Sequence, residues 1–299
     1  MSRTKIEHFI PQFYLRYFAN SKEQLFAFDK QSKRSFPTNI QKIAAHKYFY
    51  DIHPLLLPEG TDPQFVEKGL AVIEGTLAKE YPKVIESIDQ RTPINSEQQW
   101  HLAVSMALQR ARVPQLRDFA IEYAKRCEQQ PEGLPADVSN YLYDKVVAPS
   151  VHAKFMFDLA HEKLSELRDI FLKHIWIFGY HNTTKSFYIS DNPIVKIPHA
   201  SGQIGLACRG IEIVFPLTPK CILTLYEREF HKHRGKDHLQ VRRLTSDDVK
   251  RYNSAQVQQS IQWVYCQSDD FGLARSCCRA NPKICDPEHN RKMLFGSTP

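Results

Sequence analysis

The chain has 299 residues, of which 42% are hydrophobic and 24% charged, a composition typical of a globular protein with one large core or two modest ones. It contains no run of eighteen apolar residues, no signal-peptide hydrophobic region and seven irregularly spaced cysteines, which argues against a membrane span and a disulfide framework. We therefore expect a cytoplasmic protein, and its formal charge of +7 gives a mild bias towards phosphate-rich partners.

The first notable stretch runs from residue 7 to residue 18, and seven of its twelve residues are Phe, Tyr, Leu or Ile. Such a density predicts burial, because a disordered tail does not keep so much apolar surface in water. His8, Gln12 and Arg16 recur every four residues, but Pro11 prevents one continuous helix. We expect His8 in extended chain, Pro11 at the first position of a short helix, and His8 and Gln12 fixed beside the core, with an ordinary core histidine as the alternative.

Aromatic-rich segments at residues 24–29, 34–37 and 47–51 follow, separated by polar connectors. They predict a small antiparallel meander. Three prolines and a glycine between residues 54 and 63 predict a loop that ends it.

Residues 62–89 have helical periodicity, with Asp62 as a candidate N-cap before Pro63. At 100° per residue Glu74 falls on the apolar face, and Glu67 lies on nearly the same side. A carboxylate there must be paired, hydrogen-bonded, metal-bound or protonated, because a lone buried charge costs several kcal/mol. A solvated first-turn charge is the plainer interpretation of Glu67, and a buried ion pair that of Glu74.

A second helix begins at Asn95 or Ser96, with a capping box at 96–99, and runs to Pro114. Gln109 and Arg112 lie along one edge of its apolar stripe. If the two helices pack antiparallel, either residue is the natural partner of Glu74. That contact is a functional site or a buried salt bridge, and the spacing does not distinguish the two.

Further helical patterns at residues 115–127 and 138–173 complete a predicted helical lobe over residues 62–173. Strand patterns then return at residues 174–180, 186–190, 194–197, 211–215 and 221–226. Asp191 and Asn192 precede Pro193 where one strand ends, so their side chains are expected at the rim of the sheet, in a functional site or a plain Asx turn.

Residues 228–243 are basic and rich in histidine and include Lys232 and Arg234. They form a solvated face or a phosphate contact beside the active site. A last helix from Ser246 contains Asn253, and a closing strand is expected at residues 261–265. The tail holds Cys278, Cys285 and His289 but lacks the Cys-x-x-Cys pair of a strong zinc motif, so zinc is not expected.

Three sequence words carry a family resemblance: His8-Phe-Ile-Pro-Gln-Phe-Tyr-Leu-Arg-Tyr-Phe, Ser190-Asp-Asn-Pro and Phe215-Pro-Leu-Thr-Pro, followed by Asn253. In this order they resemble the signature of the domain of unknown function 4238 family, over roughly residues 5–265. The resemblance implies a bacterial or phage-borne soluble protein, and some relatives are associated with defence against phage. It implies no reaction.

The elements together predict an α+β fold, in which N-terminal and C-terminal strands form one antiparallel sheet and the helical lobe is inserted between them. We expect a single compact body with four parts: an N-terminal motif and meander (1–61), the helical lobe (62–173), the sheet with its closing helix (174–270), and a Cys-rich basic tail (271–299).

For function, we expect one pocket between sheet and lobe that cleaves phosphodiester bonds of nucleic acid in phage defence. The predicted catalytic residues are His8, Glu74, Gln109, Arg112, Asp191 and Asn192. Asp191, Glu74 and His8 would bind Mg²⁺ or Mn²⁺ to activate water, or His8 would act as acid or base with Arg112 as anion clamp and no metal.

Expected substrate contacts are Gln12, Arg16, Lys232, Arg234 and Asn253, with nucleic acid as the expected partner and a homo-oligomer left open. Two alternatives share these residues. In one, the pocket binds a small ligand or phage component and the protein is a sensor without catalysis. In the other, it hydrolyses a nucleotide or an NAD-like molecule.

Overall fold

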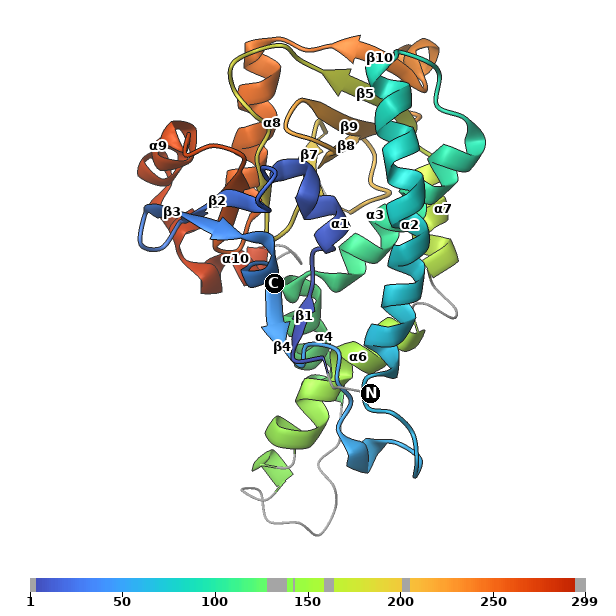
Figure 1. The fold of residues 1–299 in the computed structure, drawn as a ribbon, viewed down its shortest axis with the longest axis vertical. Helices are drawn as coiled ribbons and strands as arrows, with labels where there is room; N and C mark the ends of the chain where they lie inside the picture. The colour runs from blue at the N-terminus through green and yellow to red at the C-terminus, as the bar shows by residue number, and fades with distance from the viewer. Residues whose placement is uncertain (1–3, 128–138, 142, 159–163, 201–204, 294–299) are drawn as a thin grey trace.

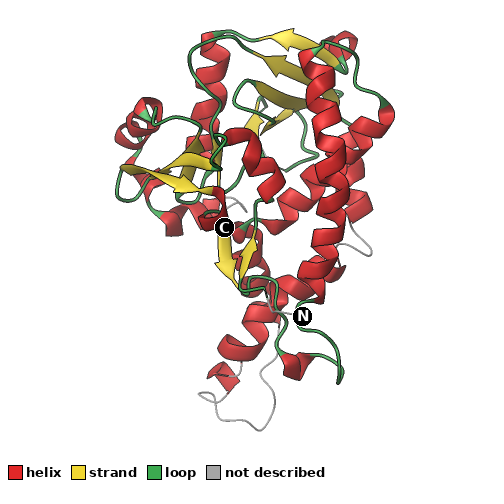
Figure 2. Cartoon of the chain, in the orientation of Figure 1, coloured by secondary structure: helices red, strands yellow, loops and turns green. Residues whose placement is uncertain are grey.

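The computed structural model describes residues 4–127, 139–141, 143–158, 164–200 and 205–293 (Figure 1). Helices and strands are mixed along the chain, and the fold is α+β, as predicted (Figure 2). Within these residues no helix combines the length and apolar character needed to cross a bilayer.

The strands form three sheets. Strand β1 (Ile6–His8) pairs with β4 (Ala45–Lys47). The second sheet has the order β10-β5-β9-β8-β7, built from β5 (Ile175–Tyr180), β7 (Val195–Pro198), β8 (Ile211–Pro216), β9 (Cys221–Tyr226) and β10 (Gln240–Arg243). The third has the order β3-β2-β11-β6, built from β2 (Gln24–Asp29), β3 (Arg34–Asn39), β6 (Ile189–Ser190) and β11 (Trp263–Cys266).

Helices occupy the middle and the end of the chain. The central ones are α2 (Phe65–Asp89), α3 (Ser96–Arg112), α4 (Pro114–Cys127), α6 (Ala148–Asp158) and α7 (Leu164–Leu172). The C-terminal ones are α8 (Ser246–Gln259), α9 (Gly272–Ala280) and α10 (Pro287–Met293). Shorter pieces are α1 (Gln12–Leu15), η1 (Arg16–Phe18), η2 (Ile40–Lys42), η3 (Pro54–Leu56), η4 (Tyr143–Val147), η6 (Lys232–Asp237) and η7 (Pro282–Cys285).

The five-stranded sheet is the middle layer of a sandwich. Every residue of β8 and β9 is buried, which explains why both read as nearly continuous apolar runs. One face, with Phe215 and Leu223, joins the main core beneath α2 and α3, and the other, with Val214 and Ile222, packs on α8. Alternate residues of each strand thus pack into the two cores on opposite faces of the sheet.

The four-stranded sheet has two unlike faces. Phe28 of β2 and Val264 of β11 pack against α9 in a separate apolar cluster. The opposite face carries Ala27, Trp263 and Tyr265, which line a cavity. This sheet supports the candidate site, because its other side is anchored by its own core.

The N-terminal stretch is buried, as predicted. Tyr14 and Leu15 are almost fully enclosed, and the Tyr14 hydroxyl donates to the Pro216 carbonyl at 2.6 Å while its ring stacks on Phe215 at 5.1 Å. Pro11 lies one position earlier than predicted, as the residue that precedes α1. The stretch therefore joins the sheet to the helical layer.

The fold departs from the prediction in three respects. The strands form three sheets instead of one, and β10 pairs with β5 in parallel, although the four-stranded sheet does join N-terminal β2 and β3 to C-terminal β6 and β11 in antiparallel pairing, as predicted. The strand expected at residues 47–51 is instead β4, which ends at Lys47, because Tyr48 takes a left-handed conformation (φ 53°) that breaks the extended chain. The capping box of α3 is formed by Asn95 and Gln98, one residue before the predicted pair.

Candidate functional site

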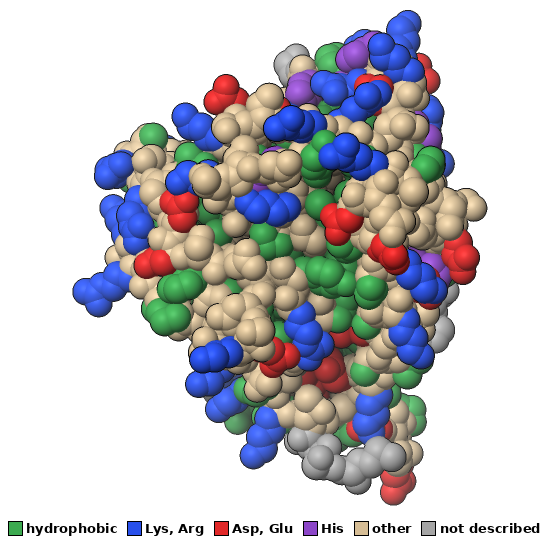
Figure 3. Space-filling view, turned by 45° about the horizontal axis from the view of Figure 1, so that its top comes forward, with side chains coloured by type: hydrophobic (Ala, Val, Ile, Leu, Met, Phe, Trp, Pro, Cys, Tyr) green, Lys and Arg blue, Asp and Glu red, His purple; other side chains and the backbone are tan. Residues whose placement is uncertain are grey.

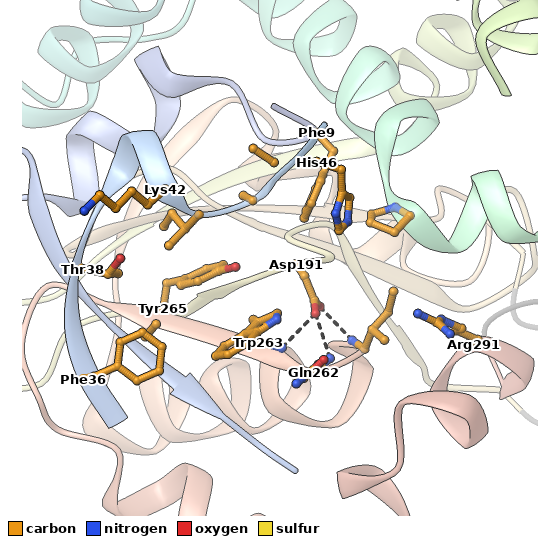
Figure 4. Close-up of a pocket in the computed structure, with 16 residues that line it drawn as sticks. Phe9, Phe36, Thr38, Lys42, His46, Asp191, Gln262, Trp263, Tyr265 and Arg291 are labelled. Carbon is orange, nitrogen blue, oxygen red and sulfur yellow. Dashed lines mark hydrogen bonds between the residues drawn. The ribbon is translucent and has the colours of Figure 1, made fainter. Parts of the chain in front are cut away.

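A cavity of about 280 Å³ lies on the face of the four-stranded sheet that carries Trp263 and Tyr265 (Figure 4). Its floor is formed by β2, β3 and β11, and its opposite wall by Phe9 and the segment from η2 to β4. Its volume is near the lower end of the roughly 300–1,000 Å³ of small-molecule sites. The cavity therefore suits one small ligand or one unit of a polymer.

Aromatic rings cover two sides of this cavity. Trp263 and Phe36 meet edge to face, with ring centroids 5.9 Å apart. On the opposite wall His46 stacks on Phe9 with centroids 5.4 Å apart and ring planes 27° from parallel. Phe36 is 42% exposed, although it belongs to a paired strand. Flat apolar walls with an exposed ring favour a planar ligand that stacks.

Two cations lie on opposite sides of the cavity, Lys42 from η2 and Arg291 from α10 (Figure 4). Arg291 already contacts two carboxylates, Asp118 at 3.0 Å and Glu288 at 2.6 Å. Lys42 is exposed and forms no ion pair with any described residue. Lys42 is therefore the cation best able to bind an anionic group of a ligand.

His46 is the imidazole that lines the cavity. Partial removal from water, reinforced by the positive charges of Arg117 and Arg291, lowers its pKa below the ordinary histidine value. A neutral imidazole at neutral pH is able to accept a proton from a water molecule or a hydroxyl group.

Asp191 also reaches the cavity wall, but its oxygens are occupied. Its carboxylate accepts hydrogen bonds from the backbone N–H groups of residues 261, 262 and 263 at 2.7, 2.8 and 2.8 Å (Figure 4). Burial raises the pKa of Asp191, and these three donors oppose the rise. The contacts fix the start of β11 and thereby the position of Trp263.

Four predicted catalytic residues meet in one buried network beneath β1. Arg112 donates from Nη2 to the His8 carbonyl at 2.6 Å and from Nε to the Tyr50 hydroxyl at 2.9 Å, and it pairs with Glu74. Gln109 donates to the Phe9 carbonyl at 3.0 Å. Of the two partners predicted for Glu74, Gln109 and Arg112, the structure has Arg112. Burial would lower the pKa of Arg112, but Tyr50 and Glu74 raise it, so the guanidinium stays charged.

The His8 side chain has partners outside this network. Its Nε2 lies 3.2 Å from the Ile40 carbonyl, and its Nδ1 lies 3.3 Å from the Gln12 amide nitrogen. Burial lowers the pKa of His8, which favours the neutral ring. Because Arg112 and Gln109 hold backbone carbonyls, the network fixes β1 and places Phe9 in the cavity wall.

A second acidic group lies in the middle of β1. Glu7 is fully buried, its carboxylate accepts from the Tyr50 N–H at 2.7 Å, and the Gln64 amide bridges it to Asp51 at 2.9 and 3.0 Å. Burial, aided by the nearby charges of Asp51 and Glu67, raises the pKa of Glu7 to about 7.

The remaining predicted residues lie elsewhere. Asn192 donates to the Gln259 carbonyl at 3.1 Å, and Asn253 bonds the backbone of residues 186 and 188. Arg16 forms a surface ion pair with Glu23 at 2.9 Å. Lys232 and Arg234 belong to η6 and do not line the cavity.

A family model described as protein of unknown function, DUF4238, matches residues 7–270 of the chain. The protein belongs to the DUF4238 family. No curated protein and no solved structure matches it.

The DUF4238 sequence words coincide with the contacts that join the layers. In the second word, the Ser190 hydroxyl donates to the Gln256 side chain at 2.8 Å, and the Gln256 amide donates to the Pro193 carbonyl at 2.8 Å. The first word packs on the third through Tyr14 and Phe215. In this DUF4238 protein, most residues of the three sequence words therefore hold the cavity walls in place and do not line the cavity themselves.

The residues predicted to bind Mg²⁺ or Mn²⁺ do not form one ligand set. The oxygens of Asp191 accept backbone N–H groups, Glu74 pairs with Arg112, and His8 faces Ile40 and Gln12. Across the described parts of the chain, no three His, Cys, Asp or Glu side chains are grouped to hold a metal. Metal dependence stays a prediction for assay.

Sequence reasoning missed the residues that line the cavity of this DUF4238 protein. Trp263 and Tyr265 alternate along the strand predicted at residues 261–265, so period two already placed them on one face. Thr38 was missed, because β3 extends to Asn39, beyond the strand predicted at residues 34–37. Which face borders the cavity depends on the pairing of β2 with β11, over 230 residues apart. His46 carries no sequence signal of its own.

Proposed function

We propose that this protein binds the terminal nucleotide of a nucleic-acid strand in the aromatic cavity and hydrolyses the phosphodiester bond that joins this nucleotide to the strand. The observation that supports this most is the combination, in one small cavity, of stacking rings, an exposed lysine and a neutral imidazole. The rings suit a base, and Lys42 suits its phosphate. Phage defence is the setting that the family resemblance suggests, and the cytoplasm is the compartment that we expect from the sequence.

In this proposal His46 is the general base. Its neutral imidazole takes a proton from a water molecule whose oxygen bonds to phosphorus, while the bond from phosphorus to the leaving oxygen breaks. Lys42 stabilises the charge that develops on the phosphoryl oxygens. His46 and Lys42 thus take the roles that the sequence analysis gave to His8 and Arg112.

Ligand binding without catalysis is the second candidate, and one observation favours it. Arg291 is held by Asp118 and Glu288, so a single unpaired lysine remains to stabilise a transition state. A sensor needs only the rings and Lys42. Both candidates predict the same occupant and differ in turnover.

The test begins with binding. Trp263 lies in the cavity, so its fluorescence should change when AMP, ATP, NAD or a dinucleotide is titrated, and Trp263→Phe should remove the change. Lys42→Gln should weaken binding of AMP more than of adenosine, because only AMP carries phosphate. If none of these ligands alters the fluorescence or the melting temperature, the proposal is wrong.

Turnover decides between the two candidates. Wild-type protein is incubated with single-stranded DNA, RNA, NAD and nucleotides, with Mg²⁺, with Mn²⁺ and with EDTA. His46→Ala should lower any cleavage rate about 100-fold or more, within the usual range for loss of a general base. His101→Ala, at a histidine of α3 outside this cavity, is the matched control and should keep the rate. Binding without cleavage under every condition supports the sensor.

A further inference from the structure

We propose that a second surface, formed by η6, β10 and the turn around Phe230, binds the backbone of a single-stranded nucleic acid. This η6–β10 surface rests on the proposed function for its substrate class, but it is a separate site. It belongs to the five-stranded sheet, whereas the cavity lies on the four-stranded sheet. Figure 1 shows β10 at one extremity of the molecule.

Charge is the first argument for this surface. Residues 228–243 contain six Lys and Arg side chains against two carboxylates, with three histidines among them. Figure 3 shows Lys, Arg and His side chains gathered at this end of the molecule. A local excess of this size attracts a polyanion more than a single phosphate.

Several of these cations are available to a ligand. Arg242 pairs with Asp237, and the guanidinium of Arg234 lies 4.4 Å from the centroid of the Tyr226 ring. Lys232, Lys236 and Arg243 are exposed and take part in no ion pair with the residues that the structure describes. Their positive charges are therefore not neutralised by the protein.

An exposed aromatic ring beside these cations points to single-stranded nucleic acid. Phe230 is 36% exposed, and the guanidinium of Arg209 lies 5.7 Å from its ring centroid. Glu227 fixes the turn by accepting from the backbone N–H groups of Phe230 and Gly210, both at 3.0 Å. A held ring among cations is a stacking platform for an unpaired base, which duplex DNA does not offer.

Edge protection alone does not explain this arrangement. β10 is an edge strand, and charged residues there prevent pairing with another chain. The arginines of β10 itself suffice for that purpose. Lys232 and Lys236 lie in η6, outside the strand, and Phe230 would weaken such protection because it is an exposed apolar ring.

The experiment measures binding of a fluorescein-labelled oligothymidylate of about 12 nucleotides, near the site sizes of single-strand binders. The charge variant combines Lys232→Gln, Lys236→Gln and Arg243→Gln. Its matched control combines Lys68→Gln, Lys79→Gln and Lys154→Gln, exposed lysines of α2 and α6 with the same loss of charge.

The charge variant should bind at least roughly tenfold more weakly at about 0.1 M salt, and its salt dependence should fall by about 0.7 per lost phosphate contact. The control should keep both values. Phe230→Ala should weaken single-strand binding roughly fivefold or more. Equal affinities of the two triple variants would overturn the proposal. So would full displacement by inorganic polyphosphate together with no effect of Phe230→Ala.

This test separates the surface from the cavity. The charge variant should bind AMP as the wild type does, because none of its changed residues lines the cavity. If the oligonucleotide binds through the η6–β10 surface while AMP and dinucleotides do not bind at all, the proposed function fails and the surface stands. If AMP binds and the two triple variants bind the oligonucleotide alike, the proposal for the surface fails and the proposed function stands.

Discussion

The network beneath β1 and the cavity on the four-stranded sheet use polar residues in opposite ways. The Arg112 guanidinium donates hydrogen bonds only within the protein itself, to two side chains and a backbone carbonyl. The cavity instead presents Lys42 and Phe36 to solvent. A buried polar group that is satisfied by its own chain fixes structure, and one that is left open at a cavity is free for a ligand. The comparison predicts that changes in the network alter stability, and changes in the cavity alter binding.

The largest effect on stability is expected for Arg112→Ala. This change removes the guanidinium that pairs with Glu74 and the Nη2 donor to the His8 carbonyl, which keeps the Tyr50 hydroxyl as a donor at 3.4 Å. Breaking a largely buried pair in this way costs about 3–5 kcal/mol. Urea unfolding followed by circular dichroism measures the loss. Arg16→Ala, which breaks an exposed ion pair, is the control and should cost less than about 1 kcal/mol. Similar losses in both variants would show that the network does not hold the fold.

Glu7 predicts a dependence of stability on pH. Its folded pKa of about 7 lies above the ordinary value of 4.5, so between these values the folded state binds more protons than the unfolded state. The contribution of Glu7 to the free energy of unfolding is therefore complete below pH 4.5. It falls by about 3 kcal/mol as the pH rises from 4.5 to 7, and it does not change further above pH 7.

Glu7→Gln tests that dependence, because its side chain keeps an oxygen for the Tyr50 N–H but does not titrate. The free energy of unfolding, measured at several pH values, should fall less steeply in the variant than in the wild type. Histidines titrate in part of the same window, and subtracting the two curves removes their contribution. Parallel curves would contradict a raised pKa for Glu7.

Asp191→Asn tests whether a motif residue at the cavity wall is structural. An asparagine has one acceptor oxygen and an NH₂ group, so at least one of the three backbone N–H groups at residues 261–263 loses its partner. We expect a loss of about 2 kcal/mol in the free energy of unfolding. Cleavage, where it occurs, should persist in the folded variant. Abolished cleavage with unchanged stability would instead support the prediction that Asp191 is catalytic.

The sequence predicted the helices and strands better than it predicted the candidate site. The faces of α2 and α3 follow from their own periodicity, and this was enough to name Gln109 or Arg112 as the partner of Glu74, although only the structure identifies Arg112. The role of Asp191 could not be predicted, because the backbone N–H groups that donate to it belong to residues 70 to 72 positions later. Its local sequence before Asn-Pro showed only a turn. The cavity was missed for the same reason, since its floor exists only when β2 and β11 pair.

Phe36→Ala should have the smallest effect on stability and a clear effect on binding. The ring is 42% exposed on an edge strand, so removing it should cost about 1 kcal/mol or less of the free energy of unfolding. Loss of a stacking ring should nevertheless raise the dissociation constant for a nucleotide roughly fivefold or more. Phe119→Ala removes an equally exposed ring, also 42%, from α4, outside the cavity, and is the matched control. Because the two variants lose the same ring at the same exposure, a difference in binding between them reports the cavity alone. Equal binding would mean that the open aromatic wall is not where the ligand lies.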